Sequence, residues 1–248
     1  MNHQITRHRL EPKRRSLTVR EKARITPGMI RILFEGSDLE DFVSLSPDDH
    51  VKLFIPTDTG EIERRDYTPR HFDGSNRTLA IDFAVHGAGP ATRWAVEAAL
   101  GDRLDFGGPR GSAVVSPSFD WWLLIGDETA LPAIGRRIEE LPSDMPVTSV
   151  VCVTGREEEQ NFATMARHEA IWVHRPDDRA SDPAPLLSAL LRMQLPKGDG
   201  FIWIAAEARV ARAVRDEFAK PAGHPPAWTK AAGYWLKGVA DAHENLEG

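Results

Sequence analysis

The sequence predicts two parts, an antiparallel β-barrel followed by an α/β domain built on a parallel sheet. Alternating apolar and polar residues dominate the first half, a continuous apolar run begins at Trp121, and helical and strand-like patterns then alternate. A chain of 248 residues has room for two small domains or one large one. The character changes near Ser116-Pro117-Ser118, so the predicted domains span residues 1–117 and 118–248, the second ending in a C-terminal tail.

The barrel rests on period-two patterns over residues 29–34, 51–55 and 79–85. Turn residues such as Pro27-Gly28 and Asp58-Thr59-Gly60 separate these runs, as in small all-β domains. Residues 1–24 hold eight Lys and Arg against two Glu, which predicts a solvated basic segment.

The α/β domain begins with the run 121–126, which is typical of a strand buried on both faces. A helical pattern of Leu131, Ile134, Ile138 and Leu141 follows it. Further strands are expected over 147–153, 171–174 and 201–206, and helices over 185–193 and 207–219. Such alternation predicts a parallel sheet with right-handed crossovers.

Composition excludes several classes of protein. The net charge of −6 argues against nucleic-acid binding. No apolar run approaches the roughly 18 residues of a membrane span, and the N-terminus has no signal-peptide core, so a cytoplasmic protein is expected. The single Cys152 excludes an iron–sulfur cluster and an internal disulfide, and its apolar surroundings predict a buried, inert thiol. The histidines form no HExxH motif, so a metal site is not indicated.

The stretch Arg65-Asp66-Tyr67-Thr68-Pro69-Arg70 has the residue types that hold a flavin. A Tyr ring can stack on the isoalloxazine, and a Thr hydroxyl can reach its polar edge. An Arg fork suits the pyrophosphate. By itself the same stretch is more readily explained as an exposed, charged strand end.

A second candidate lies over residues 86–96, where two glycines lead to Pro90 at the start of an expected helix. The free N–H groups of such a helix suit phosphate, although a simple helix cap would look the same. We expect this helix to end near Gly101 and to carry Trp94 and Leu100 inward, with Trp94 in the core. The glycine-rich turn 107–112 then displays Arg110.

Ligands of parallel sheets lie at the carboxyl ends of the strands. Asp127, Glu128 and Thr129 follow the first strand, where a nicotinamide would approach. Thr154, Gly155 and Arg156 follow the second, where an adenosine ribose usually lies. No GxGxxG is present, so the two-half dinucleotide fold is not expected. A barrel followed by a parallel sheet is the order of the ferredoxin-reductase-like flavoproteins.

Together these motifs resemble the siderophore-interacting protein family, a branch of those flavoproteins, from about Arg20 to about Gly238. The resemblance is carried by residues 25–31, 50–53, 65–70, 86–95, 108–112, 126–134 and 233–238. It implies a cytoplasmic, FAD-containing ferric-siderophore reductase. Electrons would come from NADPH, from NADH or from a ferredoxin. Fe(III) is a hard ion held by hard oxygen donors, so its reduction to Fe(II) releases it.

The resemblance and the residue chemistry assign the site. The expected cofactor-binding residues are Arg65, Tyr67, Thr68, Asp82, His86, Gly87, Gly89, Pro90, Ala91, Thr92, Asp127, Thr129 and Glu207. The family more often has Gly where this chain has Ala206. No catalytic side chain is expected, because the flavin transfers the electrons. A basic patch for an anionic ferric siderophore is expected from Lys52, Arg110, Lys230 and Lys237, although ordinary surface lysines would account equally for the last two.

Several alternatives stay open. Arg156 could read a ribose 2′-phosphate, but Glu157, Glu158 and Glu159 after it would repel one, so NADPH and NADH are both candidates. Rival functions on this fold are an NAD(P)H:flavin reductase, the reductase component of an oxygenase, and a non-catalytic siderophore-binding protein. Nothing in the sequence suggests repeats or a coiled coil, so a monomer is expected.

Overall fold

The computed structural model describes residues 3–85, 89–239 and 244–246. The chain forms two compact units, one of residues 4–115 and one of residues 116–248 together with residues 1–3. Each unit has its own cluster of buried apolar side chains.

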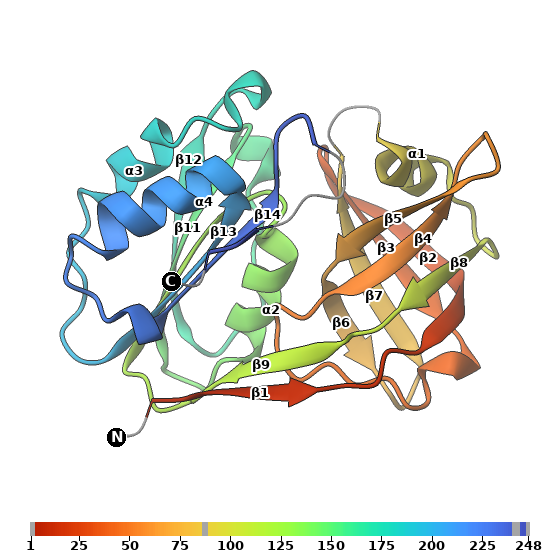
Figure 1. Cartoon of the computed structure of the whole chain (residues 1–248), viewed down its shortest axis with the longest axis horizontal. Helices are drawn as coiled ribbons and strands as arrows, with labels where there is room; N and C mark the ends of the chain where they lie inside the picture. Colours follow the sequence, from red (N-terminus) through yellow and green to blue (C-terminus); the bar gives the residue numbers. More distant parts are fainter. Residues whose placement is uncertain (1–2, 86–88, 240–243, 247–248) are drawn as a thin grey trace. The chain divides into compact units, whose positions relative to one another are not determined.

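The first unit is a barrel of antiparallel strands (Figure 1). Among the described residues its main sheet has seven strands in the order β5-β4-β8-β2-β3-β7-β6. They are β2 (Arg14–Thr26), β3 (Met29–Glu35), β4 (Val51–Pro56), β5 (Ile62–Tyr67), β6 (Pro69–Asp73), β7 (Thr78–Ala84) and β8 (Arg103–Gly107). The predicted strands 29–34, 51–55 and 79–85 are confirmed in β3, β4 and β7.

The sheet curls because of its connectivity. Its outermost strands, β5 and β6, follow one another in the chain with only Thr68 between them. The two edges of the sheet must therefore come together at Thr68. This residue marks the seam of the barrel, and the predicted flavin stretch lies across it.

Six of the eight Lys and Arg side chains of residues 1–24 are exposed, as predicted, but the segment also forms strands that the sequence reasoning missed. Strand β1 (Ile5–Arg9) pairs with β9 (Gly111–Val115), and β2 begins at Arg14. Leu17 and Val19 of β2 are fully buried. Even Arg15 is only 5% exposed, with Nη2 2.8 Å from Asp41 Oδ1. The charged residues obscured a period-two pattern, because long basic side chains can bury their stems along a strand.

Helix α1 (Pro90–Glu97) is shorter than expected, and a 3₁₀ turn, η1 (Ser37–Leu39), precedes β4. Ala98 adopts an extended backbone and ends α1 before Gly101. Leu100 therefore lies beyond the helix and is 68% exposed, so its predicted inward position is wrong. Trp94 packs against the core, with ring centroids 6.0 Å from Phe34 and 6.1 Å from Phe83.

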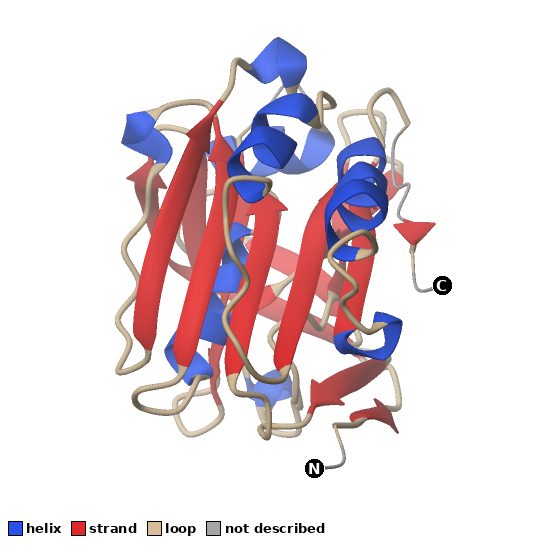
Figure 2. Ribbon diagram, turned by 90° about the vertical axis from the view of Figure 1, so that its left-hand side faces the viewer, coloured by secondary structure: helices blue, strands red, loops and turns tan. Residues whose placement is uncertain are grey.

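The second unit is built on a six-stranded sheet in the order β12-β11-β10-β13-β14-β15 (Figure 2). The strands are β10 (Trp121–Asp127), β11 (Pro146–Val153), β12 (Arg167–His174), β13 (Gly200–Glu207), β14 (Thr229–Trp235) and β15 (Glu244–Asn245). All neighbours pair in parallel except β14 and β15. The predicted parallel sheet is confirmed.

Helices cover both faces of this sheet. They are α2 (Leu131–Glu140), α3 (Ala184–Leu190) and α4 (Ala208–Val214); α4 continues into a π-helical turn, η4 (Arg215–Ala219), and 3₁₀ turns lie at Arg156–Glu158, Asp177–Arg179 and Pro226–Trp228. Trp121, Leu123 and Ile125 of β10 pack with α3 and α4. Figure 1 shows α2 on the opposite face, where Arg137 lies 4.6 Å from the Trp122 ring. Strand β10 is thus buried on both sides.

Within the described parts of the chain, every helix is too short or too polar to cross a membrane.

Candidate functional site

The carboxyl edge of the parallel sheet is organised around Asp127. This residue ends β10, and the neighbouring parallel strands β13 and β14 end beside it at Glu207 and Trp235. Asp127 Oδ1 accepts hydrogen bonds from the backbone N–H of Thr129 at 2.9 Å and from its hydroxyl at 2.5 Å. Asp127 Oδ2 accepts from Glu207 N at 2.9 Å and from Trp235 Nε1 at 3.0 Å. One buried carboxylate therefore ties three strand ends together.

Glu207 lies at the same edge and is 2% exposed. Its Oε2 accepts hydrogen bonds from the N–H groups of Arg209 and Val210, at 2.8 and 3.2 Å, so Glu207 caps α4. The other oxygen lies 3.4 Å from Lys237 N. The structure brings the predicted residues Asp127, Thr129 and Glu207 together, and it occupies the Glu207 carboxylate with backbone donors.

Beside this edge lies a buried ion pair that the sequence reasoning did not assign. Arg175 follows β12, and its backbone N–H donates to Val153 O at 2.9 Å. Its Nη2 donates to both carboxylate oxygens of Glu128, at 3.0 and 2.8 Å. Burial, with the Asp127 carboxylate beside it, raises the pKa of Glu128 to about 7, against the opposing effect of Arg175. The available signal for Arg175 was its position at the end of a predicted strand.

Cys152 lies one residue before the end of β11, close to this ion pair. It is 5% exposed, and burial raises its pKa to about 12. The thiol stays protonated at neutral pH and is a poor nucleophile. The prediction of a buried thiol is confirmed.

The end of β11 carries the residues predicted to face an adenosine ribose. Arg156 is exposed and begins the short helix Arg156–Glu158. Three glutamates follow Arg156. One of them, Glu159, forms a hydrogen bond with His174 at the end of β12, with Oε1 2.9 Å from Nε2. The acidic run is therefore partly paired.

In the barrel, the residues of the predicted flavin stretch share one side of β5. Arg65 and Tyr67 lie opposite Leu53 and Val51 of β4, which are fully buried. Cross-strand partners point to the same face, so Arg65 and Tyr67 lie on the core side of an edge strand. The Tyr67 ring lies 4.6 Å from the Phe83 ring, and burial raises its pKa above the ordinary value.

The polar groups of this stretch lie next to the seam. Arg65 forms an ion pair with Glu63 through Nη2, and its Nη1 donates to Arg64 O at 2.7 Å. Its side chain is 22% exposed. Thr68, between the two edge strands, is buried.

Asp82, also predicted to bind the cofactor, is almost completely buried in β7. It lies opposite Arg31 of β3, which donates through Nε at 2.6 Å and Nη2 at 2.7 Å. The buried Arg70 lies on its other side, with Nε 3.7 Å from Asp82 Oδ2. The structure thus gives Asp82 two arginine neighbours.

The start of α1 holds the predicted phosphate residues. Gly89 caps the helix, Pro90 is its first residue, and Ala91 and Thr92 are buried. Thr92 Oγ1 lies 3.5 Å from Ala84 O, which links the helix to β7. Among the described residues, nothing lies within 4 Å of a Cβ added at Gly89. His86 and Gly87 lie outside the described residues.

These barrel groups fit the demands of FAD. The helix start at Gly89 is uncrowded among the described residues, and the partly exposed Arg65 carries a guanidinium that suits phosphate oxygens. An aromatic ring and a hydroxyl follow within three residues on the edge strand and at the seam. The donor set therefore matches an anionic, aromatic ligand.

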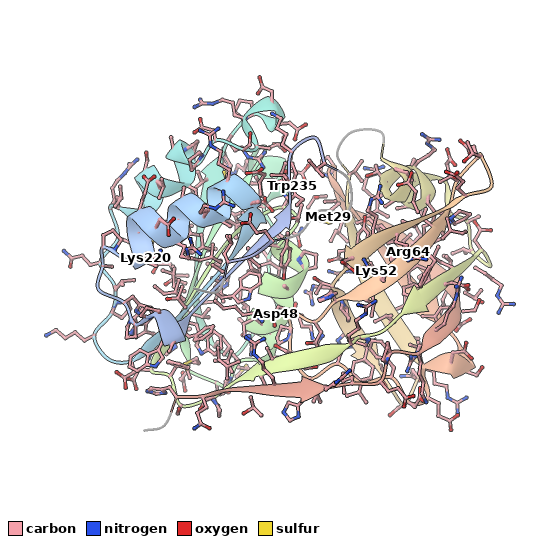
Figure 3. All side chains as sticks on the ribbon, in the orientation of Figure 1. Met29, Asp48, Lys52, Arg64, Lys220 and Trp235 are labelled. Carbon is pink, nitrogen blue, oxygen red and sulfur yellow. The ribbon has the colours of Figure 1, made fainter. Side chains whose placement is uncertain are left out.

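The four predicted basic residues are divided between the units. Lys52, labelled in Figure 3, pairs with Asp66 at 3.0 Å. It alternates along β4 with Val51, so the two side chains lie on opposite faces. Arg110 is exposed. Lys230 lies inside β14 rather than beside it, and Lys237 Nζ donates to Asp178 O at 2.9 Å.

Comparison with protein families gives two matches. The family model described as siderophore-interacting protein matches residues 119–238. The model described as siderophore-interacting FAD-binding domain matches residues 18–64 and 60–113. The matches cover both units.

Known relatives and solved structures agree with these matches. An NADPH-dependent ferric-chelate reductase of Escherichia coli is 34% identical, over 89% of this chain and 92% of the relative. A ferric vibriobactin reductase of Vibrio cholerae is 27% identical, over 71% of this chain and 72% of the relative. The crystal structure of a siderophore utilization protein from T. fusca superposes with a TM-score of 0.90 at 38% identity, covering 96% and 98% of the two chains.

Proposed function

This chain belongs to the siderophore-interacting protein family, and from that premise we propose that it is an FAD-dependent ferric-siderophore reductase that uses NAD(P)H. The observation that carries the proposal is the similarity to the E. coli ferric-chelate reductase along nearly all of both chains. One hydride carries two electrons, so one NADPH and two Fe(III) yield NADP⁺, a proton and two Fe(II).

The barrel residues hold the cofactor. Arg65 and the start of α1 bind the pyrophosphate, with Arg65 exchanging Glu63 for phosphate oxygens. Tyr67 contacts the flavin ring, and Thr68 hydrogen-bonds its polar edge. FAD supplies the ability to accept a hydride and to give up electrons singly.

The α/β unit binds the nicotinamide dinucleotide at the carboxyl edge of its sheet. Asp127 and Thr129 shape the first strand end, and the Glu207 cap fixes α4 beside it. No side chain has to move a proton in the hydride step, because the hydrogen leaves the nicotinamide with both of its electrons, and each iron is reduced by an electron alone. The protein's work here is binding and orientation.

The substrate is a ferric siderophore, which is anionic when its ligands are catecholates. Arg110 is the exposed candidate for attracting it. Lys52 contributes less, since Asp66 neutralises it. A charge reversal at Arg110 is expected to weaken binding of a ferric catecholate and to leave flavin content unchanged. Equal affinity in the variant would remove Arg110 from the substrate site.

The cellular setting is also part of the proposal. We place the protein in the cytoplasm as a monomer, with a ferredoxin as an alternative electron donor. Sedimentation of the purified protein tests whether it is a monomer. Reduction of the protein by a ferredoxin in the absence of NAD(P)H tests the alternative electron donor.

An anaerobic NADPH titration followed by visible absorption tests the main proposal. A yellow protein should bleach, and a ferric siderophore should restore the colour. A flavoprotein that bleaches but passes electrons only to free flavin would instead be a flavin reductase. A protein that cannot be loaded with FAD would contradict the proposal.

The cofactor site is tested with a matched pair of variants. Arg65→Ala should lose most bound FAD. Arg64→Ala removes the neighbouring guanidinium, which lies 5.7 Å from the Phe54 ring, and should keep its FAD. Equal flavin content in the two variants would exclude Arg65 from the site.

A further inference from the structure

Lys22 faces the inner side of the barrel sheet because β2 contains a bulge. The pairing of β2 with β3 shifts between Val19 and Glu21, so that Arg20 is an extra residue on β2. After this shift Lys22 lies opposite Ile32, which is fully buried. Cross-strand partners point to the same face of a sheet, so the bulge turns Lys22, and not its acidic neighbour Glu21, toward the inside.

The ammonium of Lys22 binds the end of α1. Lys22 Nζ donates to Val96 O at 2.7 Å and to Ala98 O at 2.9 Å. The last carbonyls of a helix have no partner within the helix and carry the negative end of its dipole. Helix α1 has no basic residue in its own last turn, so β2 supplies the cation that complements this end.

Helix α1 depends on such contacts because it is short and buries little apolar surface. It has eight residues, and the buried ones, Ala91, Thr92 and Ala95, have small side chains. Trp94 is only half-buried. Helices of this length are marginal by themselves, and small side chains remove little area from water. The two hydrogen bonds from Lys22 therefore help to fix the direction of the helix and the place of its start.

We propose that Lys22 is a positioning residue of the FAD site, which acts through α1 on the pyrophosphate. This inference rests on the proposed function, because the pyrophosphate contact at the start of α1 is part of that proposal. Lys22 and α1 both lie in the region that matches the siderophore-interacting FAD-binding domain, over residues 18–64 and 60–113. Lys22 binds the helix end opposite to the phosphate, so it orients the binding groups and does not contact the cofactor.

Variants of Lys22 test this role by their affinity for two flavins. Lys22→Met keeps the apolar stem and loses the ammonium. The Kd for FAD should rise about fivefold, because FAD binds well only to molecules in which α1 is in place. Riboflavin has no phosphate, so its Kd should stay within about twofold of wild type. Lys22→Arg keeps a cation that can donate to carbonyls and should restore FAD binding to within about twofold.

Arg20→Met is the matched control. Arg20 lies on the same strand, and its side chain is 45% exposed, near the carboxylates of Glu21 and Glu35. Its replacement removes the same charge and breaks only exposed ion pairs, so binding of FAD and riboflavin should stay unchanged. Flavin fluorescence measures both affinities on the apoprotein, and urea unfolding establishes that each variant is folded.

The outcomes separate this inference from the proposed function. If the wild-type protein binds no FAD, the proposed function fails. If the wild type binds FAD and Lys22→Met binds it equally well, this inference fails and the proposed function stands. The inference also fails if Lys22→Met loses FAD and riboflavin to the same extent, because the lysine would then stabilise the barrel in general. If Lys22→Met does not fold, Lys22→Gln takes its place under the same criteria.

Discussion

The carboxylate of Asp82 lies between two arginines inside the barrel sheet. Its side chain is 2% exposed and accepts a bidentate pair of hydrogen bonds from Arg31, with Arg70 nearby. Removing one partner of a buried ion pair leaves an uncompensated charge. Asp82 therefore stabilises the barrel, in addition to the contact with the cofactor that the sequence predicted.

We expect Asp82→Asn to lower the free energy of unfolding by about 2–3 kcal/mol. The usual cost for a buried pair is discounted because the Arg31 side chain is 35% exposed. Urea unfolding measures the change. Asp58→Asn, which breaks the exposed pair with Arg93, should cost less than about 1 kcal/mol. Loss of FAD with unchanged stability would instead assign Asp82 to the cofactor.

Glu128 makes stability depend on pH. Its folded pKa of about 7 lies above the ordinary value, so the folded protein keeps a proton that the unfolded chain has released. This contribution is present at low pH and is lost as the pH rises through about 7. Relative to Glu128→Gln, wild type should lose on the order of 1–3 kcal/mol between about pH 5 and pH 8.

Thermal or urea unfolding across that pH range checks the prediction. The exposed Glu157→Gln is the control and should follow the wild-type pH profile. Parallel profiles for wild type and Glu128→Gln would show that Glu128 does not titrate in this range.

The sequence predicted the positions of some site residues but not their partners. The positions of Asp127 and Thr129 follow from strand periodicity alone, because a strand end locates its last side chain. The Arg175 partner of Glu128 could not be predicted, since its contact joins residues 47 positions apart. Glu207 was predicted to bind the cofactor and its role as the cap of α4 was missed, although the predicted boundary between the strand 201–206 and the helix 207–219 lies at this residue.

At the level of elements, the packing of α2 on β10 depends on a glycine. A Cβ at Gly126 would lie 2.6 Å from Ala130 Cβ and 2.7 Å from Ala205 O. Both neighbours belong to the framework of the strand ends, so they have little room to move. The close approach brings the start of α2 next to Asp127.

Gly126→Ala should therefore lower the free energy of unfolding by about 1–3 kcal/mol, as for overpacking in a dense core. Gly74→Ala is the control, because its Cβ would make only an ordinary 3.7 Å contact with Phe72. Urea unfolding of both variants measures the difference. Equal stability would show that the strand ends can relax around a methyl group.

Strongly periodic elements were predicted and irregular ones were not. β10 and β13 are nearly continuous apolar runs, β11 is mostly apolar, and α2 follows a clear helical period. β2 and β1 were missed because charged residues mask their alternation. The bulge in the pairing of β13 with β14 could not be foreseen. Ala206 pairs with Gly233 and Glu207 with Trp235, and this one-residue shift depends on the partner strand and not on local sequence.

At the scale of the whole molecule, the barrel-plus-sheet fold was predictable because each unit has a distinct apolar period. The sequence did not predict that the N-terminal residues belong to the second unit. His3 belongs to it, with Nδ1 2.9 Å from Ser118 Oγ and Nε2 2.8 Å from Asp199 Oδ2. Its ring stacks on Phe119 at 4.3 Å. The start of the chain is thereby fastened to residues more than a hundred positions away.

His3→Ala should destabilise the second unit by about 1–3 kcal/mol, through the lost hydrogen bonds and ring contact. Hydrogen exchange should quicken around Ser118 and Asp199 and stay unchanged in β3 and β7 of the barrel. Uniform acceleration in both units, or none in either, would contradict this local role.

The ladder between β1 and β9 places Ile5 opposite Val115, so the chain enters and leaves the barrel at neighbouring points. In topological terms the barrel is an insertion within the other unit, whose own chain is discontinuous. A gene fragment for residues 4–115 encodes the whole barrel unit. A fragment that starts at residue 116 lacks His3, which belongs to the second unit. If the two units are expressed separately, the barrel can be made from one continuous segment, but the other unit cannot.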